Sequence, residues 1–173
     1  MKVSRIKCPD IANGLGCRLS VFVSGCDLHC PGCFNEEAWD FDVGDSLDES
    51  LLASVIERLS PVYMAGLTVL GGEPLHPRNA AGNLRLCRTV KDAYPDKDIW
   101  LYTGYTFEQL LERSEDEESI MSILADGVLD VIVDGPYVDE LHDVTLAFRG
   151  SRNQRILDAK ASVAAKRAVE YQL

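Results

Sequence analysis

Short apolar runs, each followed closely by glycine and separated by stretches with helical periodicity, constrain the fold of this chain most. We predict a strand at each of four runs: residues 19–23, 67–70, 99–102 and 131–133. Helical patterns lie between and around them: residues 51–59, 84–90 and 107–124, the last interrupted by an acidic run. Strands that alternate with helices indicate βαβ units and a parallel sheet.

The length of 173 residues limits how such a sheet can close. A complete eight-unit barrel takes about 250 residues, so we predict the α/β class with an open, partial (β/α) barrel of parallel strands. Three weaker local patterns remain. Ser46 and Glu49 fit a capping box for the first helix, residues 144–148 fit a further strand, and the Ala-rich residues 159–171 fit a helix.

The loops that follow the four predicted strands contain the most distinctive residues of the chain. Parallel strands bring their carboxyl ends to one edge of a sheet, where α/β proteins place their chemistry. Four loops fall at this edge: residues 25–34, 71–74, 103–105 and 134–136. We therefore expect these loops to form one composite site.

The charge balance excludes several kinds of protein. The chain has 17 Lys and Arg residues against 28 Asp and Glu residues, a net charge of −11, so binding of nucleic acid through a broad basic surface is not expected. No apolar run approaches the length of a bilayer span, and the first residues do not have a signal-peptide pattern. We therefore expect no membrane partner and a cytoplasmic location.

Residues 149–167 depart from this acidic character, with six basic residues against one acidic residue. Such a segment is either a solvated terminal helix or a docking patch on an otherwise acidic body, and the pattern favours the helix.

Six cysteines in a chain expected in the cytoplasm indicate metal binding or catalysis rather than disulfides. Cys26, Cys30 and Cys33 lie within eight residues, in a loop whose Gly and Pro residues let three thiolates face one centre. Structural zinc sites and ordinary iron–sulfur carriers use four protein ligands, and no fourth residue has a suitable spacing. Three cysteines leave one iron of a [4Fe–4S] cluster without a protein ligand, which is typical of a catalytic centre.

The spacing Cys26-x3-Cys30-x2-Cys33, followed by Phe34, resembles the signature of the radical S-adenosylmethionine family. Further blocks extend the resemblance along the chain to the branch that activates anaerobic ribonucleoside-triphosphate reductases. These blocks are residues 10–18, 22–26, 71–77, 97–100, 102–105, 133–135 and 149–154. The resemblance ends near Arg155, so we expect a radical S-adenosylmethionine activating domain at residues 1–155 and a C-terminal helical extension at residues 156–173.

The resemblance also implies cofactors and their ligands. A [4Fe–4S] cluster on the three cysteines would bind S-adenosyl-L-methionine at the open iron and cleave it reductively. The expected cofactor-binding residues are Gly71, Gly72 and Glu73 for the methionine amino group, the backbone of Gly32, Cys33 and Phe34 for the adenine, and Thr103 and Asp134 for ribose, carboxylate or a cation. The structural alternatives are a plain Gly-Gly turn before Pro74 and a turn-forming Asp134.

The implied substrate is a protein. The chain contains no Gly-x4-Gly-Lys-Ser/Thr loop for a nucleotide triphosphate. The resemblance implies hydrogen abstraction from a glycine near the C-terminus of the large subunit of an anaerobic ribonucleoside-triphosphate reductase, with a flavodoxin-like protein as electron donor.

Other functions remain open from the sequence. The chain would alternatively activate another glycyl radical enzyme, although the extra ferredoxin-like cysteines common in those activases are absent. A small-molecule radical enzyme such as a deazaguanine synthase would not need the block at residues 149–154. A non-catalytic metal-binding module is the remaining alternative, and metal analysis with an S-adenosylmethionine cleavage assay would separate it.

Overall fold

A seven-stranded open sheet organises the chain in the computed structural model, which describes residues 1–173. The strands are β1 Lys2–Asp10, β2 Cys17–Val23, β3 Asp45–Ser46, β4 Met64–Gly71, β5 Asp98–Tyr102, β6 Val131–Asp134 and β7 Arg155–Asp158. The helices are α1 Glu49–Leu59, α2 Pro77–Ala93, α3 Phe107–Asp116, α4 Glu118–Ala125 and α5 Ala159–Ala165. Short 3-10 turns lie at Glu36–Ala38 and Asp139–Leu141. The predicted α/β class and the open sheet are confirmed.

The order of the strands in the sheet is β3-β1-β2-β4-β5-β6-β7. The four central strands, β2, β4, β5 and β6, run parallel, as predicted. The edges are antiparallel: β1 pairs with β2, β3 with β1, and β7 with β6. The expectation of parallel strands throughout is therefore wrong at the edges. Neither β1, with Arg5 and Lys7, nor the four-residue β7 has the continuous apolar run of a buried parallel strand.

Three local predictions are wrong for identifiable reasons. Helix α1 is capped by Asp48, whose carboxylate accepts a hydrogen bond from Leu51 N at 2.9 Å, while Ser46 pairs with Lys2 in the sheet. Residues 144–148 form turns instead of a strand, because the Asp143 carboxylate accepts from Thr145 N at 3.0 Å. The last helix ends at Ala165, where Lys166 adopts a left-handed conformation.

Two other boundaries concern the expected helices and domains. The pattern at residues 107–124 divides at Glu117 into α3 and α4, at the acidic run that the sequence analysis marked as an interruption. The expected domain boundary after residue 155 falls inside β7, so the first residues of the expected extension belong to the sheet. None of the helices combines the length and the apolar character needed to cross a membrane.

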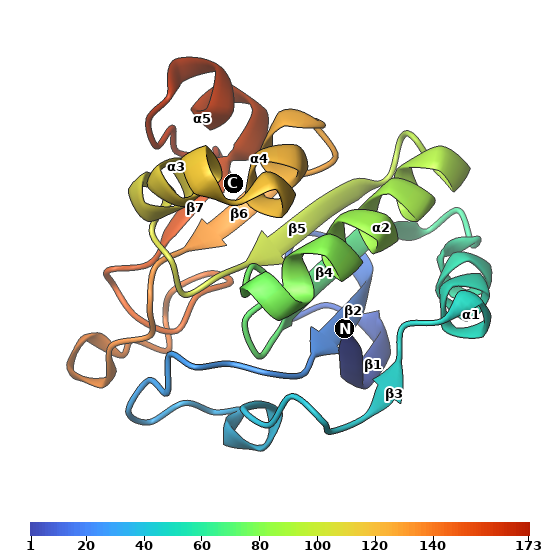
Figure 1. Ribbon diagram of the computed structural model, residues 1–173, viewed down its shortest axis with the longest axis horizontal. Helices are drawn as coiled ribbons and strands as arrows, with labels where there is room; N and C mark the ends of the chain where they lie inside the picture. Colours follow the sequence, from blue (N-terminus) through green and yellow to red (C-terminus); the bar gives the residue numbers. More distant parts are fainter.

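The two faces of the sheet bury different groups. One face packs against the helices in a core of 28 buried residues, to which successive parallel strands contribute Leu19, Leu67, Ile99 and Ile132. Figure 1 shows α2 over β4 and β5, and α3 and α4 near β6. The opposite face carries a much smaller apolar cluster, made by Trp100, Val131, Val133 and Ile156. That face also buries polar side chains, among them Arg18, Ser20 and Thr68.

Arg18 is a fully buried cation on this second face. It donates to Thr68 Oγ1 at 2.7 Å, to the carbonyls of Leu15 and Leu67 at 3.0 and 2.7 Å, and it pairs with the Asp98 carboxylate at 2.5 Å. A charge removed from water is tolerated only with such a complete set of partners. Arg18 therefore ties β2 to β4 and to the start of β5.

Replacing Arg18 with Met should lower the free energy of unfolding by about 3 kcal/mol, because the buried acceptors lose their donors. Denaturant-induced unfolding measures this change. The matched control is Arg58→Met, an exposed position on α1, which should change the free energy by less than about 0.5 kcal/mol. Equal effects of the two substitutions would contradict this account of Arg18.

Candidate functional site

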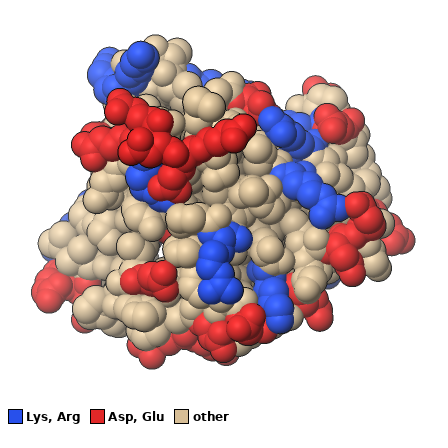
Figure 2. All heavy atoms as spheres, viewed as in Figure 1, with Lys and Arg blue, Asp and Glu red and all other residues tan.

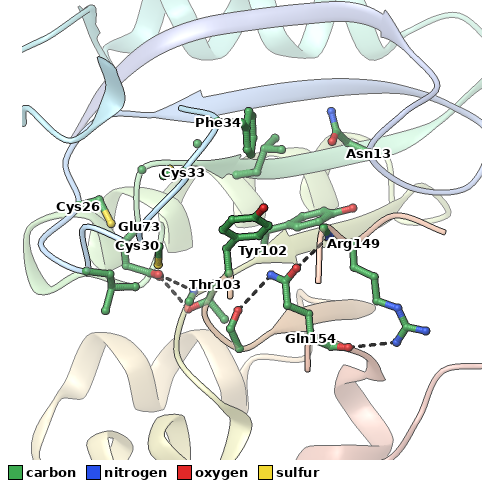
Figure 3. A pocket seen from close by; sticks show the side chains of 18 of the residues that line it. Asn13, Cys26, Cys30, Cys33, Phe34, Glu73, Tyr102, Thr103, Arg149 and Gln154 are labelled. Carbon is green, nitrogen blue, oxygen red and sulfur yellow. Dashed lines mark hydrogen bonds between the residues drawn. The ribbon is translucent and has the colours of Figure 1, made fainter. Parts of the chain in front are cut away.

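A cavity of about 410 Å³ opens at the carboxyl ends of the parallel strands, on the face that the helices do not cover. Its lining comes from all four loops that the sequence analysis assigned to one site: Cys26, Cys30, Gly32, Cys33 and Phe34 from the first, Gly71, Gly72 and Glu73 from the second, Thr103 and Gly104 from the third, and Gly135 from the fourth. Figure 3 shows the cysteines at one end of this cavity and Asn13, Arg149 and Gln154 toward the other. The predicted composite site is therefore present as a single cavity.

The cysteine loop, residues 24–39, forms one wall. Its backbone closes on itself through hydrogen bonds from Gly25 N to Ala38 O at 2.7 Å and from Cys26 N to Trp39 O at 3.1 Å. Cys26 is buried, whereas Cys30 and Cys33 are half-buried. As they stand, the three side chains line the cavity without forming a tight group of metal ligands.

Burial raises the pKa of the Cys26 thiol to about 11 and also raises the pKa of Cys30. Desolvation is the main cause in both cases, because it disfavours the thiolate. The raised pKa values favour the protonated thiols of Cys26 and Cys30 at neutral pH in this arrangement. Metal binding by these residues would release protons, since the ligand is the thiolate.

The turn Gly71–Pro74 forms the adjoining wall, and its glycines are required by packing. A Cβ atom on Gly71, whose φ is +115°, would lie 2.7 Å from Val23 N. A Cβ atom on Gly72 would lie 2.5 Å from the Gly25 carbonyl oxygen. Gly71 thus packs against the end of β2 and Gly72 against the backbone of the cysteine loop, approaches that only glycine permits. Packing within the protein by itself requires these glycines, and their expected role of making room for a ligand stays a prediction.

Glu73 braces this turn from inside the protein. Its carboxylate accepts hydrogen bonds from Thr103 Oγ1 at 2.8 Å, Gly104 N at 2.7 Å and Leu75 N at 2.8 Å. Only 1% of Glu73 is exposed, and this burial raises the pKa of its carboxyl group. Glu73 and Thr103 thereby join the ends of β4 and β5 at the cavity wall.

Asp134 is placed differently from the other predicted site residues. It does not line the cavity, and it is fully buried. Its carboxylate accepts from Phe107 N, at the start of α3, at 2.7 Å and pairs with Arg155 at 2.5 Å. Asp134 therefore stabilises the N-terminus of α3 and the pairing of β6 with β7.

Gly32 and Phe34 are the remaining predicted cofactor-binding residues of the cysteine loop. Gly32 has a φ of +72°, and a Cβ atom there would lie 2.9 Å from Asp139 Oδ1. The Phe34 side chain is 82% exposed at the edge of the cavity, so its ring does not belong to the core.

The far end of the cavity is built from the segment after β6. The Gln154 amide donates to Gly135 O at 3.1 Å and accepts from Gly150 N at 2.9 Å, while Arg149 donates to Gln154 O at 3.1 Å. Tyr102 donates to Phe148 O at 2.8 Å, which holds this segment over the sheet. Arg149, Gly150 and Gln154 of the block at residues 149–154 therefore line the same cavity as the cysteines.

The basic segment at residues 149–167 is only partly helical, since it contains β7 as well as α5. Two of its basic residues are paired with carboxylates. Arg155 pairs with Glu108 and Asp134, and Lys160 pairs with Asp130. Of its other four basic residues, three are exposed: Arg152, Lys166 and Arg167. Figure 2 shows acidic residues gathered over α3 and basic residues scattered among acidic ones on the rest of that face.

Sequence reasoning missed Asn79, a buried residue in the first turn of α2. Its amide donates to the Ser24 carbonyl and the Glu73 carbonyl, both at 3.0 Å, and thus contacts two walls of the cavity. The sequence contains a pattern that could have indicated this burial. Asn79 and Asn83 lie at helical spacing from Leu86 and Val90, so all four face the buried side of α2. Polar residues at such positions are buried only when they are hydrogen-bonded.

Comparisons with known proteins identify the family of the chain. A family model described as "4Fe-4S single cluster domain" matches residues 12–157. A protein of Pasteurella multocida is 40% identical over 149 residues, which cover 85% of this chain and 90% of the relative. A Vibrio cholerae protein is 38% identical over 149 residues, covering 85% and 91%, and one of Enterobacteria phage T4 is 38% identical over 156 residues, covering 90% and 93%. All three are named anaerobic ribonucleoside-triphosphate reductase-activating protein. The chain therefore belongs to the 4Fe-4S single cluster domain family and, within it, to the anaerobic ribonucleoside-triphosphate reductase-activating proteins.

Proposed function

We propose that this chain activates an anaerobic ribonucleoside-triphosphate reductase by forming a glycyl radical on it, with a [4Fe–4S] cluster and S-adenosyl-L-methionine as cofactors. The observation that carries the proposal is one cavity lined both by Cys26, Cys30 and Cys33 and by the turn Gly71–Pro74. The relatives that align with 85% of this chain, at 38–40% identity, are named for activating that reductase. The chain is an enzyme of this activating class.

The donor set of the cavity fits a [4Fe–4S] cluster with three protein ligands. The other three cysteines lie elsewhere: Cys87 is buried in the main core, and Cys8 and Cys17 pack against it. No fourth cysteine therefore lines the cavity, and Cys26, Cys30 and Cys33 would hold the cluster. When bound, the cluster and S-adenosylmethionine supply the one-electron cleavage that yields a deoxyadenosyl radical.

The residues of the chain would bind and orient the cofactor next to the thiols. Backbone carbonyls of the turn Gly71–Pro74 are acceptors suited to the methionine ammonium group, and Glu73 keeps the turn rigid. The backbone of Gly32, Cys33 and Phe34 would contact the adenine, and Thr103 faces the same cavity. Asp134 would act at a distance, by holding α3 and Arg155, since it does not line the cavity.

The open sheet suits a polypeptide substrate. A partial barrel of the radical S-adenosylmethionine type leaves one edge free, so that a segment of the reductase with its glycine can enter and leave. The unit that does this work would be residues 1–155, with residues 156–173 as an extension that continues β7. A flavodoxin-like protein would deliver the electron.

Changing Cys26, Cys30 or Cys33 to Ala should abolish both cluster binding and S-adenosylmethionine cleavage, because each removes one of three thiolate ligands. Iron and acid-labile sulfide analysis, with product analysis after anaerobic reduction, measures the two effects. Cys8→Ala and Cys17→Ala are the controls and should retain both. Retained cleavage in Cys30→Ala would contradict the assignment of ligands.

The reduced enzyme with S-adenosylmethionine should produce a glycyl radical on the large reductase subunit. Electron paramagnetic resonance should show a doublet, because one hydrogen remains on the glycine α-carbon and couples to the unpaired spin. Deuterating glycine in the reductase should collapse the doublet and place deuterium in deoxyadenosine. Cofactor cleavage without a radical on the folded reductase would reject this partner while leaving the enzyme class in place.

A further inference from the structure

We propose that Asn79 is a positioning residue that holds the cysteine loop and the turn Gly71–Pro74 in the relative placement that cofactor binding requires. The inference deepens the proposed function and rests on it. Asn79 lies in the first turn of α2, directly behind the cavity wall, and is 1% exposed. It is not among the residues that line the cavity, so its effect would pass through the two walls it contacts.

One amide group reaches both walls. Asn79 Nδ2 lies 3.0 Å from the Ser24 carbonyl oxygen and 3.4 Å from the Gly25 carbonyl oxygen, both just before Cys26. The same nitrogen lies 3.0 Å from the carbonyl oxygen of Glu73, in the turn. The two segments are 49 residues apart in sequence, counted from Ser24 to Glu73, and are bridged here by one side chain.

Few other hydrogen bonds join the two segments. Glu73 N donates to Gly25 O, and Gly72 N donates to Val23 O at the end of β2, each at 2.8 Å. Just past the turn, the His76 ring and the Asp27 carboxylate of the cysteine loop lie 3.0 Å apart. The Ser24 carbonyl accepts no hydrogen bond other than that from Asn79. Without Asn79 this buried acceptor loses its partner, and the loop is free to move away from the turn to reach another donor. A displacement of about 1 Å between groups that hold one ligand weakens its binding strongly.

Asn83 provides a matched control within the same helix. It lies one turn further along α2, is fully buried, and donates to the Pro74 carbonyl at 2.7 Å. It therefore shares with Asn79 the residue type, the helix, the burial and a contact with the turn. It makes no hydrogen bond to the cysteine loop, so a comparison of the two isolates the bridge between the walls.

The test compares Asn79→Ala with Asn83→Ala in cluster-loaded protein under anaerobic conditions. Equilibrium dialysis of radiolabelled S-adenosylmethionine against protein whose cluster is left oxidised gives the dissociation constant without turnover, because no electron is available for cleavage. Asn79→Ala should weaken binding by about tenfold or more, whereas Asn83→Ala should weaken it by less than about threefold. Both variants should lose comparable stability in denaturant, because each leaves a buried carbonyl without its donor.

A milder variant keeps the test decisive if Asn79→Ala does not fold or bind the cluster. Asn79→Ser retains one short donor that cannot reach both walls, and it should weaken S-adenosylmethionine binding more than Asn83→Ala does. Wild-type affinity for S-adenosylmethionine in a folded Asn79→Ser or Asn79→Ala protein would overturn this inference and leave the proposed function in place. Cluster-loaded wild-type protein that does not bind S-adenosylmethionine would overturn the proposed function, and the inference with it.

Discussion

The close approach of two backbones is the constraint on which the rest of the site depends. The end of β4 and the turn after it lie so tightly against the end of β2 and the start of the cysteine loop that neither Gly71 nor Gly72 has room for a Cβ atom. This contact brings the segment that contains the thiols to the carboxyl end of the parallel sheet. Every other wall of the cavity is then placed by the order of the strands, since β5 and β6 follow β4 in the sheet.

Buried polar side chains at both ends of the parallel strands are hydrogen-bonded mainly to backbone. Glu73 accepts from two backbone amides and a hydroxyl at the carboxyl ends of β4 and β5. Near the amino end of β2, Arg18 donates to the carbonyls of Leu15 and Leu67 and to a hydroxyl, besides its ion pair. Such bonds leave these side chains little freedom to rotate, because each alternative conformation would leave a buried polar group unpaired. The strand ends are thus held in place before any ligand binds, which reduces the ordering cost of binding.

The alternation of apolar runs and helical patterns predicts the central sheet. It also predicts which loops meet at the cavity, because loops that follow neighbouring parallel strands lie at the same edge. Thr103 meets Glu73 since both follow parallel strands that are neighbours, and the cysteine loop joins them for the same reason. The orientation of Asp134 was not predictable in this way. Its partner Arg155 lies on β7, an antiparallel edge strand that is too short and too polar to show a pattern. Asn79 was missed because a polar residue in a first helical turn usually faces solvent, and only the packing of α2 behind the turn buries it.

The distribution of the cavity wall along the chain has a consequence for biosynthesis. Lining residues extend from Ala12 to Gln154, and β7, which follows at once, completes the sheet next to β6. When the cysteine loop emerges from the ribosome, the turn Gly71–Pro74 and the ends of β4, β5 and β6 have not yet been synthesised. The segment at the far end of the cavity, residues 149–154, follows later still. Domains fold as units during synthesis, so the nascent chain exposes its thiols long before it can enclose them. A cluster held as proposed would therefore be enclosed by its full cavity only when translation is nearly complete.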